Sequence, residues 1–220
     1  MSRPKIIKET KRAIEERAPP VATSVEPHPW LSEDSLSMYR EVLRSGKAFD
    51  AYLSRLAEEK IRKHAEKDAP KRLEVMGFML GEVRTWEGLT YTLVKDVATT
   101  KLRSSPSKVR FDPEAFPKLF HGLDELAFDY VLVGWYHSHP GHTCFLSNTD
   151  MDTQRAMFGE PYHIALVIDP VNREVKTFKL RRDGYEEVPF AVFSASRNGA
   201  ERGKSSRKRR LKITPATSQE

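Results

Sequence analysis

The chain has 220 residues, of which 39% are hydrophobic and 31% charged, and its formal net charge is +6. This length and composition predict one folded domain with a substantial core plus extensions, and they exclude a largely disordered chain. No apolar run approaches the roughly 20 residues of a membrane helix, and the charged first residues lack the apolar stretch of a secretory signal, so we expect a cytoplasmic protein without a membrane partner.

Residues 1–45 are predicted to be a helical extension followed by a linker. Isoleucines fall on one side of a short helix over residues 4–17, and the X-Pro steps that follow favour extended chain. A second helix begins near Ser32 or Ser35, carries apolar residues at helical spacing and ends at Gly46.

Residues 46–196 are predicted to form the catalytic domain. A helix with apolar positions from Phe49 to Ile61 opens it, and Pro70 closes this helix. The pattern then changes to compact apolar runs and alternation, which are typical of strands. The predicted strands cover residues 75–81, 89–98, 130–136, 163–169 and 174–180, and further helices cover 113–126 and 147–158. Strands and helices mix without regular alternation, which indicates a mixed α/β fold with a curved sheet flanked by helices.

Two polar segments interrupt this pattern. The first is an insert over residues 101–110, rich in serine, whose composition alone favours a solvated loop. The second is the tail over residues 197–220, where eight basic residues against two acidic ones account for the whole net charge. We expect this tail to be flexible and disordered. It contains no aromatic residue to stack on bases, which argues against nucleic acid and leaves solvation or docking to an acidic protein partner.

A possible metal site follows the strand over residues 130–136. His137 and His139 are two residues apart at its end, so their side chains point to one face, and Asp150 opens the next helix. Two histidines and one carboxylate leave a fourth tetrahedral position open, as in catalytic zinc sites. The alternative is that the two histidines are ordinary surface residues on a strand and that Ser147 with Asp150 is only a helix cap.

Other candidate ligands are weaker. His142 follows His139 by three residues, but a loop histidine is the simpler interpretation. Cys144 is the single cysteine, so no intramolecular disulfide can form, and we expect it to pack beneath the loop. We expect His163 to pack on its strand.

The motif resembles a known family. His137-Ser138-His139-Pro140, continuing to Ser147-x-x-Asp150, is similar to the JAMM motif of the MPN+ metalloproteases, and Glu74 stands where that family has an upstream glutamate. The likeness runs from about residue 70 to about 180 and is nearest to the proteasome-lid deubiquitinase and the signalosome deneddylase. It implies a cytidine-deaminase-like MPN fold.

The resemblance also implies roles for individual residues. His137, His139 and Asp150 would hold one Zn²⁺ per chain, Glu74 would act as general base and acid, and Ser147 would donate to the oxyanion. In the lid deubiquitinase the matching insert forms a hairpin over the tail of ubiquitin. By resemblance, substrate binding is therefore expected from Lys101, Leu102, Arg103, Ser104, Ser105, Ser107 and Val109.

The implied function is hydrolysis of the bond between a substrate lysine and the C-terminus of ubiquitin or a ubiquitin-like protein, in connection with proteasomal degradation. Two alternatives stay open. The same chemistry could act on a sulfur-carrier-like protein with a ubiquitin fold, or the chain could be a non-catalytic MPN scaffold. The full set of metal ligands favours an enzyme over the scaffold.

Overall fold

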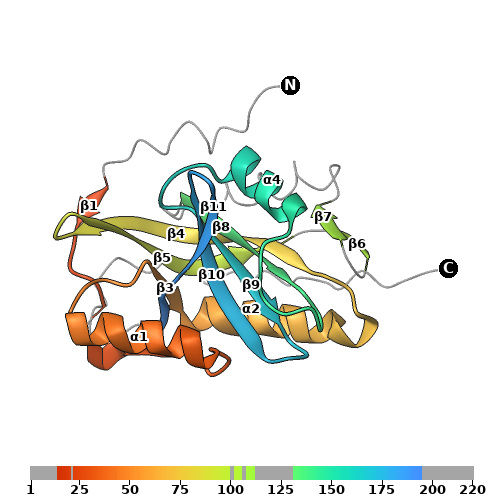
Figure 1. The fold of residues 1–220 in the computed structure, drawn as a ribbon, viewed down its shortest axis with the longest axis horizontal. Helices are drawn as coiled ribbons and strands as arrows, with labels where there is room; N and C mark the ends of the chain where they lie inside the picture. Colours follow the sequence, from red (N-terminus) through yellow and green to blue (C-terminus); the bar gives the residue numbers. More distant parts are fainter. Residues whose placement is uncertain (1–13, 21, 100–101, 106–107, 112–130, 195–220) are drawn as a thin grey trace, which may run out of the picture.

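The computed structural model describes residues 14–20, 22–99, 102–105, 108–111 and 131–194 (Figure 1). Its helices are α1 (Glu33–Ser45), α2 (Arg55–Asp68) and α4 (Asn148–Met157), with 3-10 turns at Ala22–Ser24 and Ala69–Lys71. Its strands are β1 (Glu15–Glu16), β2 (Val25–Glu26), β3 (Ala51–Ser54), β4 (Met76–Trp86), β5 (Leu89–Ala98), β6 (Leu102–Ser105), β7 (Lys108–Phe111), β8 (Val131–Ser138), β9 (Ile164–Asp169), β10 (Glu174–Arg181), β11 (Gly184–Val188) and β12 (Phe190–Phe193). The helix expected over 113–126 and the tail from residue 197 lie outside the described residues.

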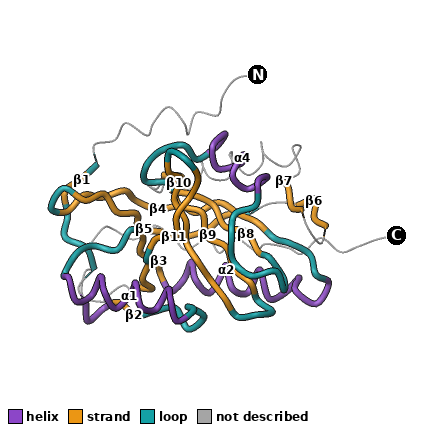
Figure 2. Tube along the Cα trace, viewed as in Figure 1, coloured by secondary structure: helices purple, strands orange, loops and turns teal. Residues whose placement is uncertain are grey.

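One mixed sheet organises the described part of the chain. Its strands follow the order β11-β10-β9-β8-β4-β5-β3-β12-β2, and β1 pairs with the far end of β4. Strand β8 lies near the middle, antiparallel to β4 and parallel to β9. The predicted mixed α/β fold with a sheet flanked by helices is confirmed, and Figure 2 shows the helices around the strands.

The strands bury side chains on both faces. One face packs against α2 through Ala57, Ile61 and Ala65 and contains the largest apolar cluster. On the opposite face, α4 covers β8, β9 and β10, and α1 covers β3, β5 and β12. In Figure 1, α4 lies above the strands and α1 lies beside β3. Burial on two faces explains why the central strands are nearly continuous apolar runs.

Strands β11 and β12, which the sequence analysis did not predict, link the two ends of the sheet. They are separated only by Pro189, so they form one strand with a bend. The first half pairs with β10 and the second half pairs with β3. A proline that lacks an N–H donor suits the position where the strand changes partners. This connection explains the curvature of the sheet.

The predicted helix from Phe49 to Ile61 is wrong in its first half. Residues 51–54 form β3, which pairs with β5 and β12, and α2 begins only at Arg55. Tyr52 packs on one face of the sheet while Ala51 and Leu53 pack on the other, as alternation requires. The Ser54 hydroxyl accepts from Ala57 N at 3.1 Å and caps α2.

The N-terminal segment packs on the same sheet. The helix expected over 4–17 is wrong in its described end, because Glu15 and Glu16 pair with β4, while residues 1–13 lie outside the described residues. The expected linker is largely extended but not free, since β2 pairs with β12 and Trp30 is buried. The predicted helix up to Gly46 is confirmed as α1. None of the described helices is long and apolar enough to cross a membrane.

The insert forms a β-hairpin. Strands β6 and β7 pair antiparallel, with Ser105 opposite Lys108, and β7 lies against β4. The loop that composition favoured is therefore replaced by the hairpin that the family resemblance implied. Residues Lys101 and Ser107 lie outside the described residues.

Candidate metal centre

Strand β8 delivers two histidines to one point. His137 lies within the strand and His139 directly follows it, held by a backbone bond from its N–H to Ile168 O at 3.0 Å. Their side chains lie on the same side, with the two Nε2 atoms 3.1 Å apart. Both side chains are almost fully buried. The prediction that the side chains of His137 and His139 share one face is therefore confirmed.

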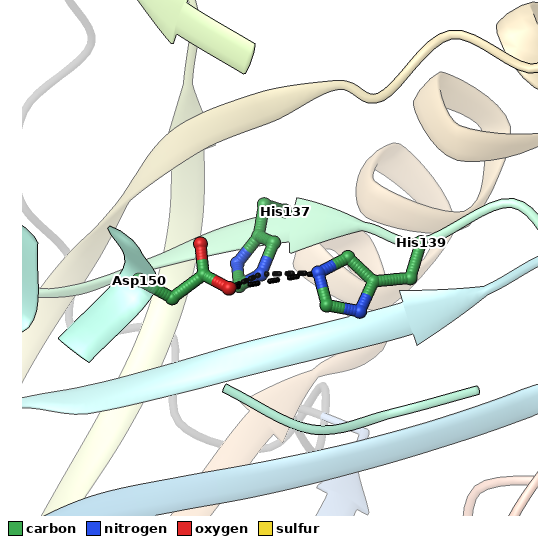
Figure 3. A group of neighbouring side chains, drawn as sticks. All are labelled: His137, His139 and Asp150. Atoms are coloured by element: carbon green, nitrogen blue, oxygen red, sulfur yellow. Dashed lines mark hydrogen bonds and ion pairs between the residues drawn. The ribbon is translucent and has the colours of Figure 1, made fainter. Parts of the chain in front are cut away.

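The carboxylate arrives from the first turn of α4. Asp150 Oδ2 lies 3.5 Å from His137 Nε2 and 3.7 Å from His139 Nε2, and Figure 3 shows the three side chains pointing toward one another. The Ser147 N–H and hydroxyl both donate to this oxygen, at 2.8 and 2.6 Å, and complete a capping box. The helix cap that stood as an alternative to the metal site is thus present together with the His-His-Asp cluster, and it holds the carboxylate toward the two histidines.

The three donor atoms match the size of a zinc site. They form a triangle with edges of 3.1, 3.5 and 3.7 Å. Bonds of about 2.0–2.1 Å in a tetrahedron place neighbouring ligand atoms about 3.3 Å apart. Two imidazole nitrogens and one carboxylate oxygen also form the donor set of a catalytic zinc with one open position. The geometry therefore fits a zinc ion.

A stacked tryptophan fixes the ring of His137. The Trp135 indole lies parallel to it, with centroids 4.4 Å apart and 11° between the planes. Trp135 Nε1 donates to Gln154 Oε1 at 2.6 Å, and Gln154 belongs to the same helix as Asp150. This contact ties the helix that carries the carboxylate to the strand that carries the histidine. The sequence analysis missed both residues, although Trp135 is two positions before His137 and Gln154 four after Asp150.

The ring of His139 is held by the loop that follows it. Its Nδ1 lies 3.2 Å from Thr143 O, and Phe145 packs against its face at 4.8 Å between ring centroids. A carbonyl accepts and cannot donate, so Nδ1 carries the proton in this contact. The lone pair of the neutral ring is then on Nε2, which faces Asp150.

The pKa values of the three residues show that they interact strongly with one another. Burial lowers the pKa of His137 and favours the neutral ring. Burial also acts to lower the pKa of His139, but the bond and charge of Asp150 outweigh it, so this pKa is raised. Burial acts to raise the pKa of Asp150, yet bonds from both histidines keep it well below the usual range. A metal would take over the role of the protons that the histidines and Asp150 share.

A cleft of about 350 Å³ opens beside these ligands and is lined in part by Glu74, Phe145, Ser147 and Thr153. Glu74 is 7% exposed. Burial raises its pKa to about 7, against a lowering by His139 and with a further rise from the Asp150 charge. An acid with such a pKa can exchange a proton near neutral pH, which a general base requires.

Three of the remaining described histidines and the cysteine form hydrogen bonds with protein groups away from the ligands. His28 contacts Glu58, His64 contacts the Tyr136 hydroxyl at 2.7 Å, and His163 contacts Leu132 O. Cys144 is buried beneath the loop, as expected, and burial raises the pKa of its thiol well above the usual range. His142 is exposed on the rim of the cleft.

Comparison with known proteins identifies the sequence family that this site resembles. Residues 49–159 match the family described as JAB1/Mov34/MPN/PAD-1 ubiquitin protease. The chain is 36% identical over 121 residues to the 26S proteasome non-ATPase regulatory subunit 14 of Dictyostelium discoideum, covering 54% of this chain and 38% of that protein. It is 35% identical over 121 residues to the ubiquitin carboxyl-terminal hydrolase RPN11 of Saccharomyces cerevisiae, with the same coverage.

Further similarity reaches beyond the proteasome. The COP9 signalosome complex subunit 5 of Yarrowia lipolytica is 32% identical over 167 residues, covering 74% of this chain and 42% of that protein. The chain thus spans about two fifths of the length of these curated relatives. The solution structure of protein DSY2949 from Desulfitobacterium hafniense superposes with a TM-score of 0.50 at 24% identity, covering 66% of this chain and 93% of that one, which supports the fold alone.

Proposed function

The chain belongs to the JAB1/Mov34/MPN/PAD-1 ubiquitin protease family, and from this premise we propose that it is a zinc-dependent isopeptidase that cuts a ubiquitin-like protein from a substrate lysine. One observation carries the proposal. Three donor atoms from His137, His139 and Asp150 converge at the spacing expected of zinc ligands, beside a buried glutamate that lines a cleft. This combination favours an enzyme over a non-catalytic scaffold.

Each protein group has a task in hydrolysis. Zinc held by His137, His139 and Asp150 would supply a Lewis acid and lower the pKa of a water to about 7. Glu74 would accept the proton of the attacking water and pass it to the lysine amine that leaves. Burial already raises its pKa in the metal-free site, which favours uptake of a proton by this carboxylate.

Ser147 would donate a hydrogen bond to the oxyanion. In this structure its single hydroxyl proton points to Asp150 Oδ2, and its backbone N–H binds the same oxygen. The hydroxyl would therefore turn toward the substrate while the N–H keeps Asp150 in place. Because the side chain lines the cleft, a rotation about its Cα–Cβ bond is enough.

The hairpin of β6 and β7 is proposed to cover the substrate tail. Strand β5, which precedes the hairpin in the sequence, ends near the site: Thr99 Oγ1 donates to Met76 O at 2.8 Å, and Met76 is two residues after Glu74 and lines the cleft. An extended tail can pair with a strand edge through its backbone, and a small Gly-Gly end would pass a narrow groove. We expect a short Gly-Ser linker in place of residues 101–107 to lower kcat/KM at least about tenfold without changing zinc content. Unchanged kinetics would make the hairpin a passive connector.

Partners are proposed from the relatives. Two of them are named as a proteasome regulatory subunit and a signalosome subunit, so we propose that this chain acts on ubiquitin-like conjugates within the cytoplasm, alone or with a larger assembly. The basic residues from Arg197 onward would dock an acidic partner. Such docking would weaken as salt rises, whereas cleavage of a small conjugate would not.

The decisive test is cleavage of purified conjugates. Protein loaded with one equivalent of zinc is mixed with ubiquitin and sulfur-carrier-like proteins, each joined to a lysine peptide, and the released peptide is measured. We expect cleavage that a chelator stops and added zinc restores, and no cleavage by Glu74→Gln. Cleavage that resists the chelator, or that Glu74→Gln retains, would refute the proposed chemistry.

A further inference from the structure

The loop between β8 and α4 controls one of the proposed ligands. Thr143 O accepts a hydrogen bond from the N–H of His139 Nδ1 at 3.2 Å, so that Nε2 carries the lone pair of the ring. If the carbonyl moved away, the ring could turn or place its proton on Nε2. The position of Thr143 therefore decides which nitrogen of His139 is available.

Thr143 is held in a conformation that its side chain disfavours. Its φ is +66°, in the left-handed region that β-branched residues rarely adopt. Its side chain is exposed, so packing of the side chain does not impose this backbone. A conformation of this kind persists only where neighbouring contacts enforce it. The enforcing contact has to act on the backbone.

Asp169, at the end of β9, makes that contact. Its carboxylate is completely buried. Oδ2 accepts from Thr143 N at 2.8 Å and Oδ1 accepts from Gly141 N at 2.9 Å. The same carboxylate also accepts from Val171 N, Asn172 N and Asn172 Nδ2 in the turn after β9. These donors offset the burial of the charge and lower its pKa, so the group is an anion when the loop is formed.

We propose that Asp169 is a positioning residue for the metal site, which holds Thr143 so that its carbonyl selects the His139 tautomer with Nε2 free to bind zinc. It belongs neither to the three-residue ligand cluster nor to the lining of the cleft, and its proposed effect is transmitted through the loop. The inference rests on the proposed function because it assigns His139 as a ligand. Groups that orient a metal-binding histidine typically change metal affinity 10- to 100-fold when removed.

The alternative is that Asp169 serves only the turn over residues 170–173. The two roles can be separated because they use different donors. In Asp169→Asn the amide keeps one oxygen, which can retain the three bonds of Oδ1. Its NH₂ group then faces the Thr143 N–H. Because both groups are hydrogen-bond donors, the bond that holds Thr143 is lost. Asn172→Ala is the matched control, because it removes another donor from Oδ2 and leaves Thr143 bound.

The first measurement is zinc affinity by competition with a chromophoric chelator. We expect Asp169→Asn to bind zinc about 10- to 100-fold more weakly than wild type and Asn172→Ala to stay within about twofold. Equal affinities of all three proteins would overturn the proposal. An equal loss in both variants would also overturn it, because the defect would then belong to the turn.

The second measurement is the tautomer of His139, from ¹⁵N chemical shifts of the imidazole in metal-free protein at pH 9. We expect the proton on Nδ1 in wild type and a mixture in Asp169→Asn. A wild-type ring with its proton on Nε2 would overturn the proposal even if the variant did not fold. If wild type binds no zinc at all, the proposed function fails instead, and the two failures are distinct.

Rescue gives a third readout. Glycine adopts a positive φ without the steric cost that threonine has. We therefore expect Thr143→Gly combined with Asp169→Asn to recover most of the lost zinc affinity. A double variant as weak as Asp169→Asn alone would show that Asp169 does not act through the conformation of Thr143.

Discussion

The described part of the chain contains two buried groups of histidine and carboxylate, around Glu58 and around Asp150, and they differ in whether every polar atom has a protein partner. In the first, His28 Nε2 contacts Glu58 at 3.2 Å, and His28 Nδ1 accepts from Trp30 N at 3.0 Å. Arg62 Nε donates to the same Glu58 oxygen at 2.9 Å. Each ring nitrogen has a protein partner and the carboxylate has a cation, so this group is complete without a ligand.

The second group is incomplete by the same criterion. The Nε2 atoms of His137 and His139 converge with a carboxylate oxygen, and His137 Nδ1 has no hydrogen-bond partner. Among the described residues, no lysine or arginine pairs with Asp150. The comparison teaches that burial of His and Asp does not by itself indicate a metal site. Two imidazole nitrogens and a carboxylate oxygen that converge on one point, with no lysine or arginine among the described residues to neutralise the carboxylate, do indicate one.

The largest expected effect comes from breaking the second group. His139→Ala removes one of three ligands, so we expect zinc content to fall from one per chain to near zero and cleavage to become undetectable. Elemental analysis of protein purified without chelator measures the first quantity. His28→Ala, the matched change in the first group, should retain one zinc. Zinc bound fully by His139→Ala would remove this residue from the site.

The second largest effect is expected when the proposed general base, Glu74, is removed and the zinc ligands are kept. Glu74→Gln should keep the fold and bind one zinc, while kcat falls about 100- to 10,000-fold because the water loses its base. Single-turnover cleavage with matched zinc loading measures the effect. Turnover equal to wild type would assign the base to another residue.

A smaller effect is expected from the complete group. His28→Ala leaves the Trp30 N–H without its acceptor and Glu58 without one donor, which should lower the free energy of unfolding by about 1–3 kcal/mol. Urea denaturation of zinc-loaded protein measures this change. Cleavage by the folded variant should equal that of wild type, and a reduced kcat in His28→Ala would mean that the two groups are coupled.

The smallest effect is the pH dependence of stability in metal-free protein, which should have opposite signs for Glu74 and Glu58. Burial raises the pKa of Glu74 to about 7, so ionising it costs stability, and this cost appears as pH rises from about 4.5 to 7. Glu58 has the opposite sign: burial acts to raise its pKa, but bonds from His28 and Arg62 prevail and lower it. Its stabilisation is present at neutral pH and is lost as pH falls through its folded-state pKa.

Metal-free Glu74→Gln should therefore be more stable than wild type at pH 8 and equal to it at pH 4.5. Glu58→Gln should be less stable than wild type at pH 8. Thermal denaturation at the two pH values tests both signs. Stabilisation by Glu74→Gln at pH 4.5 would attribute its effect to packing rather than to charge.

Local patterns were enough to predict much of the scaffold. Helix α1 has Ser32 as its N-cap and Gly46 as its C-cap, as the sequence predicted. Strands β5, β9 and β10 lie where alternation or apolar runs predicted them. The pair His137 and His139 could be predicted to share a face, because side chains two apart on a strand do so in any fold.

The tertiary structure alone decided what long-range pairing controls. Tyr52 and Leu53 fit a helix by spacing, yet their neighbours β5 and β12 come from residues 89–98 and 190–193, and pairing with both makes them a strand. Asp169 reads in sequence as the start of a turn, and only the fold places Gly141 and Thr143 against its carboxylate. Sequence periodicity reports which face a residue occupies. It does not report which distant segment lies on that face, because that depends on the packing of the whole sheet.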